Sequence, residues 1–187
     1  MAEAIKNKSV FEQLQLTLDY LGIDNDILAV NQKNPIEQLI VSFPIDDNEN
    51  SEGNIGIEMM FIDELDKLAV GEQVEEVEII SMLQFFVNLG IKPTDENIAE
   101  MTALILRFNS FLPIGSFGLS EQNDIFFRYT LALKDRNVDS SLFIELLDMI
   151  NFYIRILGHK IVDFANKKLT FQNALQNGIK ELSGALE

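Results

Sequence analysis

The sequence has no cysteine, no tryptophan and a single histidine, His159, among its 187 residues. Without cysteine the chain can form no disulfide, no thiolate metal site and no cysteine nucleophile. One histidine leaves almost nothing from which to build a Ser-His-Asp triad or a multi-histidine metal site. No run approaches the roughly 18 apolar residues of a membrane span, and residues 1–15 lack the apolar stretch of a signal peptide. These absences predict a soluble, cytoplasmic protein, and we expect it to carry no cofactor and no metal.

Positive charge is scarce too, since 14 basic residues face 30 acidic ones, for a formal net charge of −16. Residues 46–96 contain 14 acids and two lysines, so 2 − 14 places −12 of that charge in about a quarter of the chain. Such a surface repels nucleic-acid phosphates and anionic lipid, so we expect neither as a ligand. Two interpretations stay open: a solvated face that keeps the protein in solution, or a site that attracts a basic partner.

What the chain does contain is apolar material, with 47% hydrophobic residues and 14 phenylalanines. A period of three to four residues predicts helices over residues 9–21, after a capping Ser9 and before a terminating Gly22, and from Thr94 to about residue 108. A third helix begins after Asp139 and ends at Gly158. A period of two predicts strands over residues 37–43, 54–62, 74–87, 111–119 and 124–133.

The order of these elements predicts an α+β fold, in which a five-stranded antiparallel sheet has helices packed on it in the order α-β-β-β-α-β-β-α. We expect this domain to cover residues 1–159. Residues 160–187 form a helical extension, either one kinked helix or two short ones after a second cap at Thr170. The extension docks either on the domain or on a second subunit.

Residues 112–149 show a recognisable arrangement. A bent strand with Gly115 and Phe117 leads to a polar hairpin and a strand of the form Ile-Phe-Phe-Arg-Tyr, and a loop passes through Asp139 into an apolar helix. This run resembles the second half of the type III secretion chaperone-like fold, and especially the YbjN-like branch, which is grouped with Tir-chaperone-type bacterial proteins. The resemblance implies a small, acidic, often dimeric, non-enzymatic protein. It supplies no catalytic residue, and fold-level analogy is a weak argument for function.

Several sequence motifs that could support catalysis or ligand binding lack residues that this chemistry requires. A calcium loop that starts at Asp46 lacks the required glycine at Ser51 and the bidentate acid at Ile57. Glu75, Glu76 and Glu78 are candidates for the paired carboxylates of a glycoside hydrolase, and Glu76 and Glu78 share a strand face. An acidic outer face of the sheet explains them better. Residues 115–118 are too short for a phosphate loop, and His159 is expected to complement a helix C-terminus.

Large apolar side chains lie opposite the core-facing positions of three strands, where a sheet with one helical layer is usually wet. They are Met60, Ile62, Ile80, Met82, Phe86 and Phe126. We expect these six residues to contact the C-terminal segment, a second copy in a homodimer, or a client polypeptide. The leading hypothesis is a chaperone-like protein-binding module with a protein partner. The alternatives are a regulatory adaptor that binds a folded partner and, with least support, the glycoside hydrolase.

Overall fold

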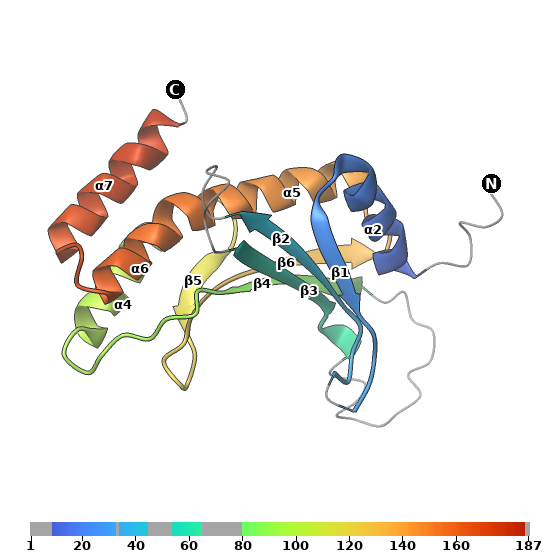
Figure 1. Cartoon of the computed structure of the whole chain (residues 1–187), viewed down its shortest axis with the longest axis horizontal. Coiled ribbons are helices and arrows are strands. Elements are labelled where there is room, and N and C mark those ends of the chain that lie inside the picture. The colour runs from blue at the N-terminus through green and yellow to red at the C-terminus, as the bar shows by residue number, and fades with distance from the viewer. Residues whose placement is uncertain (1–8, 33, 45–53, 65–79, 186–187) are drawn as a thin grey trace. The chain divides into compact units, whose positions relative to one another are not determined.

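The computed structural model describes residues 9–32, 34–44, 54–64 and 80–185. These residues form a single antiparallel sheet of six strands in the order β1-β2-β3-β4-β6-β5 (Figure 1). The chain divides into two compact units, one made of residues 1–85 and 130–147 and the other of residues 86–129 and 148–187. Within the described ranges, no helix combines the length and the apolar character needed to cross a membrane.

The first unit contains the N-terminal helix, three complete strands, parts of two further strands and part of one further helix. Its complete elements are α2 (Val10–Leu21), β1 (Asp24–Leu28), β2 (Gln38–Pro44) and β3 (Asn54–Phe61). It also contains residues 80–85 of β4 (Ile80–Asn88), residues 130–134 of β6 (Ile125–Lys134) and residues 140–147 of α5 (Ser140–Tyr153).

Strand β1 makes the sheet six-stranded, so the predicted five-stranded sheet and the order α-β-β-β-α-β-β-α are wrong by one strand. Its sequence, DNDIL, shows no apolar alternation, and no local pattern identifies it as a strand. It is extended because it pairs with β2, where Asn25 is opposite Val41 and Ile27 is opposite Leu39. An edge strand of this kind is specified by its neighbour rather than by its own residues.

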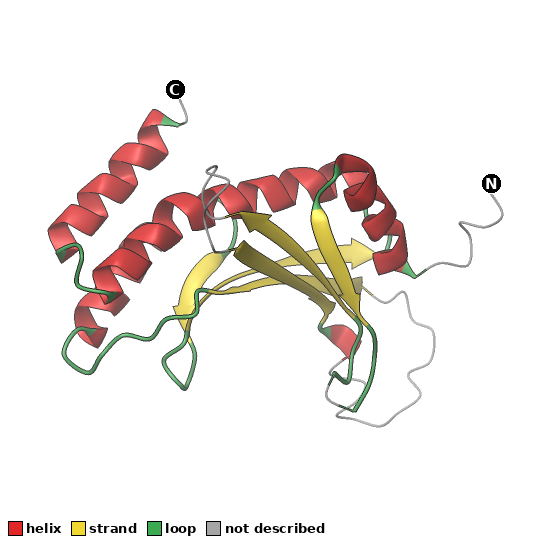
Figure 2. Ribbon diagram, in the orientation of Figure 1, coloured by secondary structure: helices red, strands yellow, loops and turns green. Residues whose placement is uncertain are grey.

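The core of the first unit lies on one face of the sheet. Alternate residues of β2, β3 and β4 are at most 3% exposed, namely Leu39, Val41, Ile57, Met59, Phe61, Leu83 and Phe85. Helices α2 and α5 both cover this face, because Phe11 stacks on Phe61 at 5.4 Å and Phe143 contacts Phe85 at 6.3 Å between ring centroids (Figure 2). The period-two prediction for these strands is therefore confirmed where the structure describes them.

The second unit contains the remaining parts of β4, β6 and α5 together with β5 (Ser116–Leu119) and three further helices. These are α4 (Ile98–Asn109), α6 (His159–Ala165) and α7 (Phe171–Gly184). Helix α7 packs on α4, on α6 and on the π-helical segment η1 (Ile154–Gly158). The helices approach closely at Gly178, where a Cβ atom would lie 2.8 Å from the Phe108 ring. Whether residues 160–187 form an extension separate from residues 1–159 stays a prediction.

Three of the predicted helix starts are confirmed. Ser9 and Glu12 form a capping box at α2, and Gly22 ends that helix with a left-handed φ of 70°. The Asp139 carboxylate accepts the Leu142 N–H at 2.9 Å at the start of α5. The Thr170 hydroxyl accepts the Asn173 N–H at 3.3 Å at the start of α7. Each of these caps satisfies a backbone donor that has no partner within its helix.

One predicted helix end and one predicted helix start are wrong. Gly158 does not terminate its helix, because it keeps a right-handed φ of −59° inside η1 and the chain continues into α6. A Cβ atom there would lie 3.3 Å from Ile154 Cγ2, so the glycine serves close packing rather than a stop. His159 is accordingly a helical residue and not a cap. Helix α4 begins at Ile98 instead of Thr94, since the Thr94 N–H donates to the Asn97 side chain in a preceding turn.

Candidate functional site

The sheet face opposite the core of the first unit carries four apolar side chains, here called the first outer patch, of which two are exposed and two are half-buried. Its members are Met60, Ile62, Ile80 and Met82. Ile80 is 64% exposed and Met82 is 40% exposed, whereas Ser81 and Leu83, which alternate with them on β4, are 3% and 0% exposed. Strands β3 and β4 adjoin at this place, because the Ile62 N–H donates to the Met82 carbonyl at 3.0 Å. Four of the six predicted contact residues therefore belong to one surface.

Carboxylates share the outer face of this unit with the patch. The strand register pairs Asp26 with Ile40 and Ile40 with Glu58, so these three side chains point to the same face as Met60 on β3. Asp24 lies on this face as well, opposite Ser42. Burial raises the pKa of Glu58 above its ordinary value. A carboxylate that is partly removed from water in this way gains from a cation that approaches it.

Phe86 and Phe126 form a second outer patch, which lies in the second unit. Their rings stack at a centroid separation of 5.5 Å. The Arg128 guanidinium lies 5.8 Å from the Phe126 ring, and a Cβ atom on Gly118 would come within 2.6 Å of Phe126 Cζ. Both rings are half-buried by these neighbours. The role of all six residues as partner or dimer contacts stays a prediction.

Sequence reasoning missed a charged junction in the first unit, centred on Arg136. Its guanidinium donates to Glu64 Oε1 at 2.6 Å and to Asp63 Oδ2 at 3.0 Å, and its Nε donates to Ser81 Oγ at 3.3 Å. The same guanidinium lies 4.4 Å from the centroid of the Phe61 ring. Because the partners are 72 and 73 residues away in the chain, no local pattern could have identified the junction.

The junction joins the loop after β6 to the first outer patch. Asp63 accepts the Met82 N–H at 3.0 Å in addition to the Arg136 guanidinium. Burial tends to raise the pKa of Asp63, but the bond from Met82 and the charge of Arg136 outweigh it and hold that pKa below its ordinary value. Burial likewise opposes the charge of Arg136, while Glu64 and Asp63 raise its pKa. Asp63 and Arg136 are therefore both ionised at neutral pH.

Arg136 and the preceding Asp135 lie in the left-handed region, with φ of 52° and 55°. The Asn137 N–H donates to the Lys134 carbonyl at 3.1 Å, which closes a tight turn around the two residues. Aspartate tolerates this conformation better than arginine does. The contacts of the Arg136 side chain offset the strain of its backbone.

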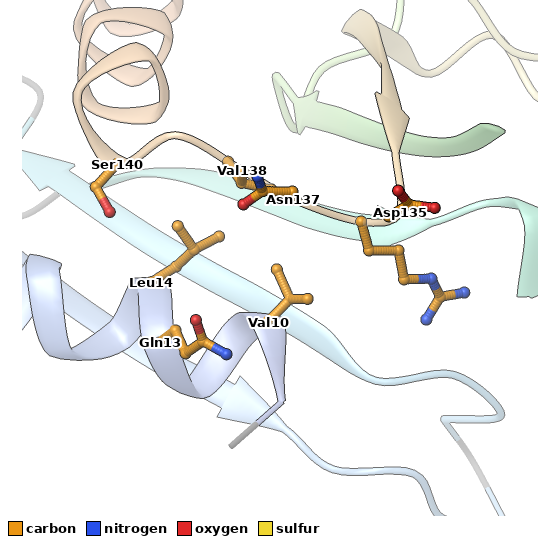
Figure 3. A pocket seen from close by; sticks show the side chains of 8 residues that line it. Val10, Gln13, Leu14, Asp135, Asn137, Val138 and Ser140 are labelled. Atoms are coloured by element: carbon orange, nitrogen blue, oxygen red, sulfur yellow. The ribbon is translucent and has the colours of Figure 1, made fainter. Parts of the chain in front are cut away.

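A cavity of about 360 Å³ lies between this turn and the N-terminal part of α2 (Figure 3). Its walls are formed by Val10, Gln13, Leu14, Asp135, Arg136, Asn137, Val138 and Ser140. The only histidine of the chain is not among them, so the cavity offers no nucleophile and base pair of the serine-histidine type. Among the described residues, no three histidine, aspartate or glutamate side chains come together to hold a metal ion.

The remaining sequence motifs contribute no site within the described residues. The calcium-loop candidates Asp46 and Ser51 and the carboxylates Glu75, Glu76 and Glu78 lie outside the described residues. Gly115 has a φ of 65°, as a bend requires.

Comparison with protein families gives one match. Residues 69–151 match the model of the YbjN family, whose description is "Putative bacterial sensory transduction regulator". The match agrees with the YbjN-like part of the resemblance, and the likeness to secretion chaperones stays a prediction. A comparison with curated proteins found no match. A comparison with solved structures found none either.

Proposed function

We propose that this protein is a non-enzymatic regulatory module that binds a protein partner through the first outer patch. The similarity of residues 69–151 to a family of bacterial sensory transduction regulators supports a binding or adaptor role. The observation that carries the proposal is the exposure of Ile80 and Met82 on a strand whose other face is fully buried. Exposed apolar side chains that are grouped on a regular element are typical of protein interaction sites.

The partner is a polypeptide that combines apolar and basic residues. Methionine is unbranched and polarisable, so Met60 and Met82 can adapt to differently shaped apolar side chains. Asp24, Asp26 and Glu58 on the same face attract lysine or arginine, and the net charge of −16 steers a basic partner towards the protein over a longer range. Charge complementarity thus selects the partner, and apolar contact holds it.

A binding titration with a defined probe tests the proposal. The probe is a fluorescently labelled amphipathic peptide of leucine and lysine, and its matched control replaces every lysine with glutamate. The full-length protein should bind the first peptide and not the second, as measured by fluorescence anisotropy. The double variant Ile80→Ser and Met82→Ser should weaken binding about tenfold or more, because it removes apolar contact area.

The second unit offers a matched control for this experiment. Leu106 on α4 is 65% exposed, nearly the same as Ile80, but it is not part of either outer patch. Leu106→Ser should leave the affinity for the peptide unchanged. Equal loss of binding in Leu106→Ser and in the double variant would show non-specific adhesion and would contradict the proposal.

A homodimer is the second candidate for the outer patches, because the exposed Ile80 and Met82 can also contact a second copy of the chain. The molecular mass of the wild type and of the double variant Met82→Ser and Phe86→Ser, measured by light scattering, separates a homodimer from a site for another protein. A dimer that dissociates in the variant assigns the patches to self-association. A monomer in both cases excludes self-association. Prevention of a client's aggregation would identify a chaperone, whereas a stable complex with a folded protein would identify an adaptor.

A further inference from the structure

The chain has no cysteine, so the thioether sulfurs of its six methionines are its only sulfur atoms. Five of these methionines lie within the described residues. Met59 and Met101 are 0% exposed and belong to the core. Met82 and Met149 are 40% and 36% exposed, and Met60 is half-buried. An oxidant must contact a sulfur atom to react with it, so we expect Met82 and Met149 to be oxidised first.

The backbone of Met82 is held in place on both sides. Its N–H donates to Asp63 Oδ1 at 3.0 Å, and its carbonyl accepts the Ile62 N–H at 3.0 Å. The Arg136 guanidinium fixes Asp63 in turn, at 3.0 Å from Asp63 Oδ2. The Met82 side chain lies on the outer face, whereas Leu83 beside it is in the core. A chemical change at the Met82 sulfur therefore alters the first outer patch and leaves the core intact.

Oxidation of a methionine changes the property on which an apolar patch depends. The sulfoxide is polar, whereas the thioether is apolar and flexible. A sulfoxide oxygen is hydrogen-bonded to water in the free protein, and burial against apolar side chains of a partner removes that water. Met82 lies next to Ile62 and on the same strand face as Ile80, so its oxidation introduces a polar group within this patch.

We infer that Met82 is a modification site, at which oxidation to the sulfoxide lowers the affinity of the first outer patch for its partner. The oxidant is a hydroperoxide, of which hydrogen peroxide is the simplest. The sulfur lone pair attacks one peroxide oxygen, the O–O bond breaks and an S–O bond forms. The proton of the transferred oxygen goes to the departing hydroxide, which leaves as water. The sulfur is oxidised by two electrons and the peroxide is reduced by two. This inference rests on the proposed function, because it assigns a regulation to the same surface.

Peptide mapping by mass spectrometry tests the selectivity, with hydrogen peroxide as the probe. The full-length protein is treated until about two oxygen atoms have been added per molecule, and catalase then removes the excess peroxide. Met82 and Met149 should be oxidised about tenfold faster than Met59, or more, with Met60 between them. Met59 and Met60 are neighbours in the sequence, so a difference between them reports the face of β3. Oxidation of Met59 as fast as that of Met82 would overturn the inference.

Fluorescence anisotropy with the leucine and lysine peptide, which contains no sulfur, measures the consequence for binding. The oxidised wild type should bind about fivefold more weakly than the reduced protein, because apolar contact is lost. The two methionine sulfoxide reductases with dithiothreitol should restore the affinity, and no thiol of this chain takes part. The Tm of the oxidised protein should stay within about 2 °C of the reduced value, since the change is confined to the surface.

Two variants assign the effect to one sulfur atom. Met82→Leu removes the sulfur and keeps an apolar side chain, so its affinity should be the same before and after peroxide treatment. Met149→Leu changes a residue of α5 outside both outer patches and should lose affinity on oxidation as the wild type does. Equal weakening in oxidised Met82→Leu and in the oxidised wild type would overturn the inference, and so would full affinity of a wild type oxidised at Met82. In both cases the proposed function would stand. A reduced wild type that fails to bind the peptide would instead overturn the proposed function and this inference together.

Discussion

The two outer patches differ in how far neighbouring residues of the protein cover them. In the first, Ile80 and Met82 are 64% and 40% exposed. In the second, Phe86 and Phe126 stack on each other, Arg128 lies over one ring and the other strand of the hairpin offers Gly118 in place of a side chain. The first patch leaves the side chains of Ile80 and Met82 exposed, whereas the second covers much of its own apolar area.

The comparison shows that apolar residues at equivalent strand positions need not have equivalent roles. A flat aromatic ring can cover a glycine and stack on a neighbouring ring, so it stabilises the fold from the outer face. Flexible aliphatic side chains beside carboxylates gain little within the fold and are available for binding. The first patch is therefore the better candidate for a partner site, and the variants below test this difference.

The largest expected effect concerns the aromatic packing of the second unit. Gly115→Ala would place a Cβ atom in overlap with the Phe127 ring and 2.9 Å from the Arg128 carbonyl oxygen, at a φ of 65°. We expect a loss of about 3 kcal/mol in the free energy of unfolding, because both overpacking and backbone strain act. Urea denaturation measures it. Gly56→Ala, where nothing lies within 4 Å of the new Cβ atom, should change stability far less.

The Arg136 junction supports the first unit and should give the next largest effect. Arg136→Met leaves Asp63, whose side chain is 15% exposed, without its cation, and we expect a loss of about 2 kcal/mol at pH 7. Arg128→Met removes a matched arginine beside an aromatic ring in the second unit and should cost clearly less. Equal losses of unfolding free energy in Arg136→Met and Arg128→Met would mean that the ion pairs of Arg136 contribute nothing to stability.

The junction also predicts a pH dependence. The pKa of Asp63 is lower in the folded protein than its ordinary value of 3.8, so ionised Asp63 stabilises the fold above pH 3.8. This stability is lost as the pH falls through the lower, folded pKa. The difference in stability between the wild type and Arg136→Met should therefore be constant from pH 7 to about pH 5 and shrink below about pH 4. A difference that grows on acidification would contradict this assignment.

A pair of truncations compares the patches directly. Phe126→Ala should cost about 1.5 kcal/mol, since the ring loses its contacts with Phe86 and Gly118. Met82→Ala should cost about 0.5 kcal/mol or less, because its side chain is already 40% exposed. Thermal unfolding measures the loss of stability in each of the two variants. A larger loss in Met82→Ala than in Phe126→Ala would contradict the distinction between the patches.

The smallest effect concerns Glu58. Because burial raises its pKa in the folded protein, the ionised form destabilises the fold at neutral pH, and this penalty disappears below the ordinary pKa of 4.5. Glu58→Gln should raise Tm slightly at pH 7 and leave it unchanged at pH 4 or below. A lower Tm at pH 7 would mean that Glu58 has a favourable partner. In the peptide titration, the same variant should weaken binding of the lysine peptide.

Local patterns in the sequence were enough for most of the helices and strands. The stripe of Phe11, Leu14 and Leu18 and the caps at Ser9, Asp139 and Thr170 appear in the structure as predicted. They succeed because a helix period, a strand period and a cap depend on residues within four positions of each other. The outer apolar positions could be predicted for the same reason, since strand alternation assigns each residue to a face.

Other features depended on residues distant in sequence and were missed or assigned wrongly. β1 is a strand only because it pairs with β2. Gly158 continues a helix instead of ending it, and a Cβ atom there would lie 3.3 Å from Ile154 and 3.6 Å from Leu89. The residues next to Arg136 in the sequence suggest an exposed polar loop. In the fold, its side chain donates hydrogen bonds to Asp63, Glu64 and Ser81. The cavity beside it combines residues 10–14 with residues 135–140.

The sequence by itself therefore determined the periodic elements, most of their caps, the faces of the strands and the acidic character of this protein. The tertiary structure alone decided the sixth strand, the charged junction, the cavity and the degree to which each outer patch is covered. The physical reason is range: hydrogen bonds along a helix and alternation along a strand act between near neighbours. Burial, ion pairing and ring stacking act between whichever residues the fold brings together.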